Sequence, residues 1–202
     1  MADVTDPTDE RAGTTMPYDY FDHMYAESSD PWGFDDRWYE RRKFAVTLAS
    51  LPHERYRRGL EAGCSNGALT ELLATRCDRL VAFDFVDTAV ARCRERLAGH
   101  GHVDVVAASF PDFWPPGTGD LVVWSEVAYY VRNGAADAAL AGLEAWLEPG
   151  GHVVAVHYLG ATNHPRDGGD IVPWLDDADF LERRCLHRDE GFELGVWECQ
   201  PR

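Results

Sequence analysis

Between residues 57 and 158, short runs rich in Val, Leu and Ala alternate with longer segments in which apolar residues recur every three or four positions. The short runs show little polar alternation, as expected of parallel strands that are buried on both faces. We expect strands at 57–62, 79–84, 103–108, 120–125 and 151–158, and helices at 67–76, 86–99 and 134–147. This βαβα order predicts an α/β fold with a doubly wound, Rossmann-like sheet.

The chain on either side of this alternation follows other patterns. A helix is expected from about 36 to 51, where Pro52 ends it. After the fifth strand, residues 173–183 have a helical pattern. Residues 184–189 and 192–199 indicate two strands, which we expect to form an antiparallel hairpin at one edge of the sheet.

A glycine turn joins the first expected strand to the first helix of the alternation. Gly63 and Gly67 have the spacing G-x-x-x-G, which differs from the G-x-G-x-x-G of dinucleotide enzymes. Such a turn brings backbone N–H groups and a helix N-terminus up to a ligand. Asp84 follows Gly67 by 17 positions and closes the second strand, where a carboxylate can accept ribose hydroxyls. The pattern predicts a nucleoside cofactor without a phosphate.

Further site candidates follow from the rule that ligands bind beyond the carboxyl ends of parallel strands. The residues at these ends are Gly63, Cys64 and Ser65, then Asp84 and Phe85, then Ala108, Ser109 and Phe110, then Ser125 and Glu126, and finally His157 and Tyr158. A helix cap or an ion pair is the alternative for Glu126, and a hydrogen-bonded core histidine is the alternative for His157. The basic run 41–43 is expected to be a solvated helix face. His100 and His102 form a loop pair that could touch a metal, but no further Cys/His set has metal-ligand spacing, so no metal is expected.

Composition limits the possible partners. The net charge of −16 argues against nucleic acid. The chain has no run of 18 apolar residues and its acidic start lacks an apolar signal region, so neither a membrane partner nor a signal peptide is expected. Five cysteines without any C-x-x-C predict reduced thiols in a cytoplasmic protein. A monomer or a homodimer is compatible with the sequence.

Several of these motifs resemble those of class I S-adenosylmethionine-dependent methyltransferases, namely EAGCSNG at 61–67, Asp84 and LEPGG at 147–151. The chain resembles in particular the nodulation protein S family of nodulation-factor N-methyltransferases, over roughly residues 18–200. The motifs that carry this closer resemblance are DPW at 30–32, WYERRK at 38–43, SEVAYY at 125–130, His157-Tyr158, GGDIV at 168–172 and ELGVWE at 193–198.

The resemblance implies a seven-stranded sheet with a reversed last strand, binding S-adenosyl-L-methionine and releasing S-adenosyl-L-homocysteine. Gly63, Ser65 and Gly67 would shape the pocket for the amino acid end of the cofactor, with Cys64, Phe85 and Ser125 beside it. Asp84 would hold the ribose, and Ala108, Ser109 and Phe110 would border the adenine. Ser109 stands where many members carry an Asp. Trp32, Tyr39 and Arg42 would close a helical cap over the cofactor, with Arg42 pairing with its carboxylate.

Residues 1–16 are polar and acidic and lack apolar periodicity, so a disordered tail is expected there, followed by a single methyltransferase domain at 17–202. Within that domain, the cap is expected at 17–52, the cofactor-binding core at 53–160, and an acceptor-side insert with the C-terminal hairpin at 161–202.

The expected reaction is methyl transfer to an amine of a small molecule. Glu126 would orient or deprotonate the amine, with His157 as partner or alternative base and Tyr130 beside them. Tyr129 and Asp170 would bind the acceptor. The family's acceptor is an amino sugar of a chitin oligosaccharide, but Leu159 replaces the usual basic residue after the His-aromatic pair. The alternatives are an O-methyltransferase, a non-catalytic S-adenosylmethionine-binding protein and, less favoured without G-x-G-x-x-G, a nicotinamide oxidoreductase.

Overall fold

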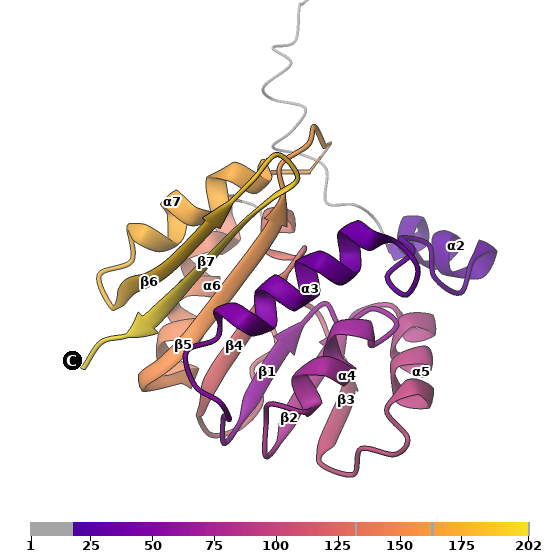
Figure 1. Cartoon of the computed structure of the whole chain (residues 1–202), viewed down its shortest axis with the longest axis horizontal. Helices are drawn as coiled ribbons and strands as arrows, with labels where there is room; N and C mark the ends of the chain where they lie inside the picture. Colours follow the sequence, from indigo (N-terminus) through magenta and orange to yellow (C-terminus); the bar gives the residue numbers. More distant parts are fainter. Residues whose placement is uncertain (1–17, 132, 163, 202) are drawn as a thin grey trace, which may run out of the picture.

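A seven-stranded sheet in the order β3-β2-β1-β4-β5-β7-β6 forms the centre of the molecule (Figure 1). The structure is a computed structural model that describes residues 18–131, 133–162 and 164–201. The tail expected at 1–16 lies outside the described residues. The strands are β1 (Gly59–Ala62), β2 (Leu80–Asp84), β3 (Val103–Ala107), β4 (Gly119–Ser125), β5 (Leu147–Tyr158), β6 (Leu181–Arg188) and β7 (Phe192–Cys199).

Six of the seven strands run in one direction, and β7 runs against both of its neighbours, β5 and β6. The chain winds outward from β1 to β3 and then crosses back to β4 on the other side of β1. Strand order therefore reverses between β1 and β4, which is where open α/β sheets bind their ligands. The doubly wound sheet and its reversed final strand are confirmed.

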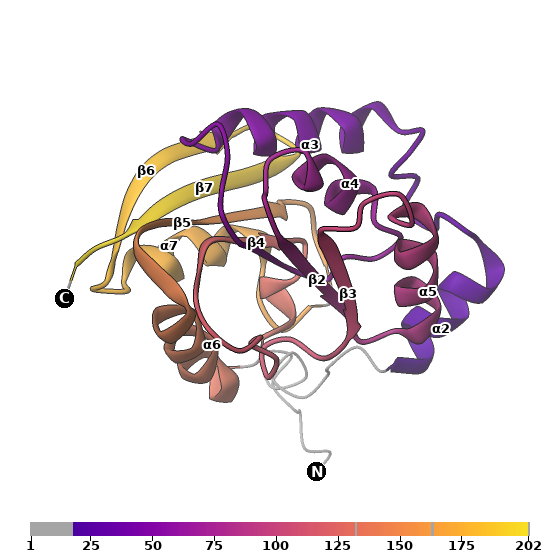
Figure 2. The same cartoon turned by 90° about the horizontal axis from the view of Figure 1, so that it is seen from below.

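Helices cover both faces of the sheet (Figure 2). They are α2 (Tyr18–Glu27), α3 (Trp38–Ser50), α4 (Ala68–Ala74), α5 (Asp87–Arg96), α6 (Asn133–Trp146) and α7 (Ile171–Asp176), with short 3₁₀ turns η1 (Ala128–Tyr130) and η2 (Gly168–Asp170). One core cluster joins the sheet to α3, α4 and α5, and a second joins it to α6 and α7. Helix α2 packs beside α5 and brings Phe21 and Tyr25 against Val86 and Ala89.

The helix expected at 173–183 is only half right. Helix α7 ends at Asp176, and residues from Leu181 onward form β6. One edge of β7 pairs with β5, and β6 pairs with its other edge from Leu181 opposite Cys199 to Arg188 opposite Glu193. Strand pairing in the sheet thus overrides the local helical pattern, as tertiary context commonly does.

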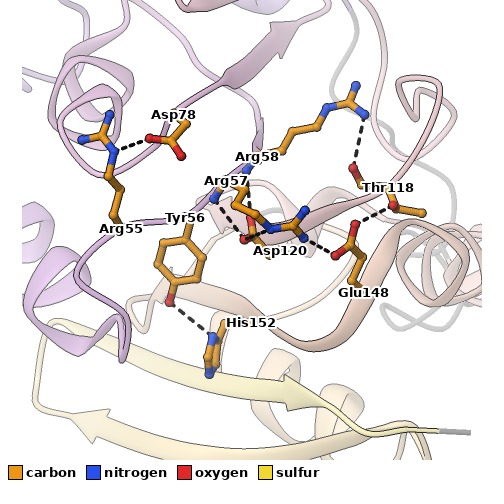
Figure 3. A network of polar contacts seen from close by, with 9 residues as sticks. All are labelled: Arg55, Tyr56, Arg57, Arg58, Asp78, Thr118, Asp120, Glu148 and His152. Atoms are coloured by element: carbon orange, nitrogen blue, oxygen red, sulfur yellow. Dashed lines mark hydrogen bonds and ion pairs between the residues drawn. The ribbon is translucent and has the colours of Figure 1, made fainter.

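A polar network fixes the amino-terminal ends of the strands (Figure 3). Asp120 on β4 accepts hydrogen bonds from the backbone N–H groups of Arg57 (3.0 Å) and Arg58 (2.8 Å). The Arg57 guanidinium also pairs with Glu148 at the start of β5. The network ties the start of β1 to β4 and β5, so this end of the sheet is occupied by structural contacts and the site must be sought at the other end.

No helix within the described ranges is both long and apolar enough to cross a membrane. The five cysteines are all free thiols.

Candidate active site

A cavity of about 710 Å³ lies at the carboxyl ends of the strands, beneath the cap formed by α2 and α3. It is lined by most of the residues predicted at the strand ends: Gly63, Cys64 and Ser65 after β1, Asp84 and Phe85 from β2, and Ala108, Ser109 and Phe110 after β3. Ser125 and Glu126 from β4 and both Tyr129 and Tyr130 from η1 complete the far wall, and Trp32 and Tyr39 contribute from the cap. The sequence rule for strand ends therefore located one continuous cavity.

The glycine turn has the left-handed backbone that its sequence requires. Gly63 has φ of 72° and Gly67 has φ of 84°, both in the region that disfavours a side chain. Ser65 between them also has a positive φ of 51°, and its backbone N–H donates to Asp84 Oδ2 at 3.0 Å. The turn and the carboxylate thus form one unit. Gly67 does not line the cavity. It is the N-cap of α4 and sets the direction in which that helix leaves the turn.

Gly67→Ala is expected to lower the free energy of unfolding by about 1–2 kcal/mol, the cost of a left-handed non-glycine residue. The added Cβ would also lie 2.9 Å from Cys93 Sγ and 3.2 Å from Cys93 Cα on α5. Urea denaturation measures the effect. Gly99→Ala is the matched control, because a Cβ there meets nothing within 4 Å. Equal stability of the two variants would contradict this account of the turn.

Asp84 is a buried acid beside the glycine turn of the cavity. Its carboxylate accepts backbone N–H groups from Ser65 through Oδ2 and from Val86 through Oδ1, each at 3.0 Å. Burial raises the pKa of Asp84, and the backbone hydrogen bonds from Val86, Ser65 and Phe85 offset only part of this rise. Each oxygen still has a lone pair for a donor from a ligand. Two neighbouring hydroxyls of a ribose would meet this need.

Glu126 forms an ion cluster with two residues of α3. Lys43 Nζ lies 2.6 Å from Glu126 Oε1 and 2.8 Å from Glu40 Oε2, and the Lys43 side chain is only 1% exposed. The other oxygen of Glu126 accepts the backbone N–H of Tyr158 at 3.0 Å. Glu126 has φ of 54°, an uncommon backbone for a non-glycine residue and one that clusters at functional sites.

The charges in this cluster determine one another. Burial alone would raise the pKa of Glu126, but attraction to Lys43 and the hydrogen bonds from Lys43 and Tyr158 bring it below its ordinary value. Burial likewise opposes the charge on Lys43, and the two carboxylates nevertheless raise its pKa. Burial raises the pKa of Glu40 against the attraction of Lys43. Glu126 therefore stays ionised and is a weak base at neutral pH.

The basic run on α3 departs from its predicted arrangement. Lys43 points into the molecule and lines the cavity, because α3 lies along the sheet and one side of the run must face inward. Arg42 pairs with Asp189 at 2.5 Å and lies over the Phe192 ring, so it does not reach the cavity. Arg37, which precedes α3, does line the cavity. The expected contact of Arg42 with the cofactor carboxylate is not supported.

His157 also departs from its predicted role as a base. Its side chain is fully buried outside the cavity lining, and its Nε2 accepts the backbone N–H of Ala128 at 3.0 Å. Burial lowers the pKa of His157 to about 4, so the ring is neutral. The contact fixes the start of η1 and thereby the positions of Tyr129 and Tyr130. Asp170 is exposed and exchanges capping hydrogen bonds with Asp167, so it does not line the cavity either.

Several lining residues were not predicted, namely Tyr25, Phe34, Arg37, Glu40, Lys43, Glu61 and His164. Tyr25 lies on α2, and its hydroxyl is hydrogen-bonded to the Ser65 side chain. The apolar spacing of α3 did not indicate Lys43, because the buried residues of that helix are Glu40, Lys43, Phe44 and Thr47 while Trp38 is exposed. His164 lies in a loop without any periodic pattern, and no sequence signal pointed to it.

Within residues 18–131, 133–162 and 164–201, no group of three or more His, Cys, Asp or Glu side chains is arranged to hold a metal.

The sheet order, the reversed β7 and the cavity beyond the β1 turn define the class I methyltransferase fold. A family model for nodulation protein S (NodS) matches residues 22–156, and the chain belongs to this family. Nodulation protein S of Sinorhizobium fredii is 36% identical over 134 residues, which are 65% of this chain and 62% of that protein. The Rhizobium tropici protein is 37% identical over 63% of this chain and 54% of its own length. The match thus spans less than two thirds of these relatives.

Two solved structures are similar over more of the chain. The N-methyltransferase NodS from Bradyrhizobium japonicum WM9, crystallised with S-adenosyl-L-homocysteine, is 27% identical with a TM-score of 0.79, covering 90% of this chain and 98% of that one. A Pseudomonas syringae protein provisionally described as a methyltransferase is 40% identical with a TM-score of 0.72, covering 80% and 99%.

Proposed function

We propose that this chain transfers a methyl group from S-adenosyl-L-methionine to an amine of a small molecule, within one cavity. The observation that carries the proposal is the division of that cavity. Asp84 and the glycine turn form one wall, and ionised Glu126 with Tyr129 and Tyr130 forms the other. The nodulation protein S relative from Bradyrhizobium japonicum is itself an N-methyltransferase. When bound, the cofactor supplies an electrophilic methyl group on a sulfonium.

The residues of the first wall fit the proposed cofactor. Gly63 presents backbone without a side chain, and a Cβ there would crowd Val127 at 3.2 Å. Glu61 lines the cavity, and its buried Oε2 has no hydrogen-bond partner among the described residues. Burial raises the pKa of Glu61 to about 8. An ammonium group of the amino acid end would favour the ionised form of Glu61 and pair with it, while Arg37 at the cap would meet the carboxylate of the same end.

The second wall suits an amine better than a hydroxyl. Glu126 is held ionised by Lys43 and can attract an ammonium or accept a hydrogen bond from an amine N–H. Tyrosine rings beside it favour cationic groups over neutral ones. An alcohol would require a strong base to become nucleophilic, and both Glu126 and His157 have lowered pKa values. An amine needs only to lose its proton and be aligned. Alignment alone can lower the activation barrier by about 7 kcal/mol.

The acceptor class that we propose is an amino sugar, in line with the family to which the chain belongs. The test is S-adenosyl-L-homocysteine release from S-adenosyl-L-methionine with a glucosamine tetramer, and with the fully N-acetylated tetramer as its matched control. Release with the free amine alone supports the proposal. Equal release with the acetylated control points to O-methylation. Tight binding of the cofactor without release for amines or alcohols would indicate a non-catalytic binding protein.

A further inference from the structure

His164 is a cavity residue for which neither the fold nor the strand-end rule gives a role. It lies in the connection between β5 and η2 and lines the cavity beside Thr162. Its ring is packed against the rings of Tyr129 and Tyr130, with centroids 4.3 and 4.5 Å away. The connection is fastened to η1 by a hydrogen bond from the Arg166 N–H to the Tyr129 carbonyl at 3.2 Å. The imidazole is therefore held at the same wall as Glu126.

The hydrogen-bonding state of this ring is unusual. His164 Nδ1 is enclosed and has no hydrogen-bond partner among the described residues. Leaving a buried polar group unpaired costs about 1–3 kcal/mol, and such groups call for a functional explanation. A neutral imidazole always keeps one lone pair. In the tautomer with hydrogen on Nδ1, that lone pair is on Nε2.

The other candidate bases at this wall already have partners. Both oxygens of Glu126 are engaged, one by Lys43 and the other by the Tyr158 N–H. His157 uses its Nε2 to accept the Ala128 N–H. A group that can take the proton assists methylation of an amine, because the nitrogen must offer a lone pair and its product is otherwise left charged.

We propose that His164 is the group that accepts the proton of the methyl acceptor. The inference rests on the proposed amine methyltransferase function. The amine nitrogen forms the new N–C bond with its lone pair, the C–S bond breaks with its electron pair left on sulfur, and the extra proton passes from nitrogen to His164 Nε2 and then to solvent. Two tyrosine faces and the charge of Glu126 stabilise the imidazolium that forms.

The surroundings of His164 set the expected pH dependence. Burial lowers its pKa below 6.5, and attraction to carboxylates offsets part of this effect. The ring is therefore neutral and able to accept a proton at pH 7, and we expect kcat to fall as the pH drops through this lowered pKa. The titratable groups that face the ring are Glu126, Tyr129, Tyr130, His157 and Asp167.

The test is His164→Asn with the glucosamine tetramer as the probe, against His53→Asn at the opposite end of the sheet as a control. We expect kcat at pH 7 to fall about 100-fold, the lower range for general base catalysis, with the acidic limb of the pH profile lost. Calorimetric binding of S-adenosyl-L-homocysteine is expected to be unchanged, which shows that the variant is folded. Unchanged kcat and pH profile in His164→Asn would overturn the proposal.

A second readout separates this inference from the proposed function. In the wild-type protein with S-adenosyl-L-homocysteine bound, the ¹⁵N resonance of His164 Nε2 is expected to shift when the tetramer is added. A shift without any turnover would support the contact with the amine while rejecting the methyltransferase function. Turnover in the wild type without a shift would reject His164 alone. Neither turnover nor a shift would reject both.

Discussion

Asp84→Ala weakens the binding of S-adenosyl-L-homocysteine about 100-fold in our expectation, a loss of about 2.7 kcal/mol. The carboxylate is oriented by two backbone hydrogen bonds at 3.0 Å and has one lone pair on each oxygen directed away from them. Charge-assisted hydrogen bonds contribute about 1.5–3 kcal/mol each, so the loss of two ribose contacts suffices for this effect. Isothermal titration calorimetry measures it.

The control for this prediction is Asp104→Asn on β3, an exposed acid away from the cavity. It should leave affinity unchanged. Asp84→Ala also removes the acceptor for the Ser65 N–H, so the glycine turn itself could shift. Asp84→Asn keeps the shape and one acceptor oxygen, and an intermediate affinity is expected from it. Affinity in Asp84→Ala within twofold of the wild type would contradict the assignment of the ribose site.

Lys43→Met is expected to lower the free energy of unfolding at pH 8 by about 3–5 kcal/mol, the usual cost of removing one partner from a buried ion pair. It leaves Glu40 and Glu126 facing each other without the cation that now lies 2.6–2.8 Å from both. Urea denaturation across a pH series measures the loss. Arg41→Met, an exposed position on the same helix, is the matched control and should change stability by less than about 0.5 kcal/mol.

The loss in Lys43→Met should depend on pH, with a sign that follows from the carboxylates. In the wild type, the folded-state pKa of Glu126 is lowered, so its stabilising effect is present above the unfolded pKa and lost as the pH falls through the folded one. Without Lys43, burial raises the pKa of both acids, and stability should instead fall as the pH rises. The difference in the free energy of unfolding between Lys43→Met and the wild type therefore increases from pH 5 to pH 8. Adding Glu126→Gln to Lys43→Met should reduce this difference in unfolding free energy at pH 8. A difference that does not change with pH would contradict the assigned role of Lys43.

Much of the fold was predictable because buried parallel strands produce short apolar runs. The expected strands at 79–84 and 120–125 correspond to β2 and β4, and the alternation between them allowed few topologies. The strand-end rule then placed Asp84 and Glu126 in the same cavity before any contact was known. These predictions depend on backbone geometry that repeats along the chain, so a local pattern was sufficient.

The residues that could not be predicted are those whose roles depend on packing. Nothing in the run 41–43 says which of its cations faces inward, since that depends on how α3 lies on the sheet. Residues 181–183 have a helical pattern in the sequence, but they pair with β7 as part of β6. His157 lies near the carboxyl end of β5 as expected, yet full burial and its hydrogen bond from the Ala128 N–H remove it from the site. The position of His164 in the cavity depends on how its loop packs against Tyr129 and Tyr130, which no local sequence pattern predicts.

The central claim is that the cavity transfers a methyl group to nitrogen. The most direct measurement is ¹³C NMR of the product formed from S-adenosyl-L-methionine labelled at its methyl carbon and the glucosamine tetramer. We predict a single labelled resonance in the N-methyl region, with S-adenosyl-L-homocysteine released in equal amount. A labelled resonance in the O-methyl region, or no labelled product despite tight cofactor binding, would contradict the claim.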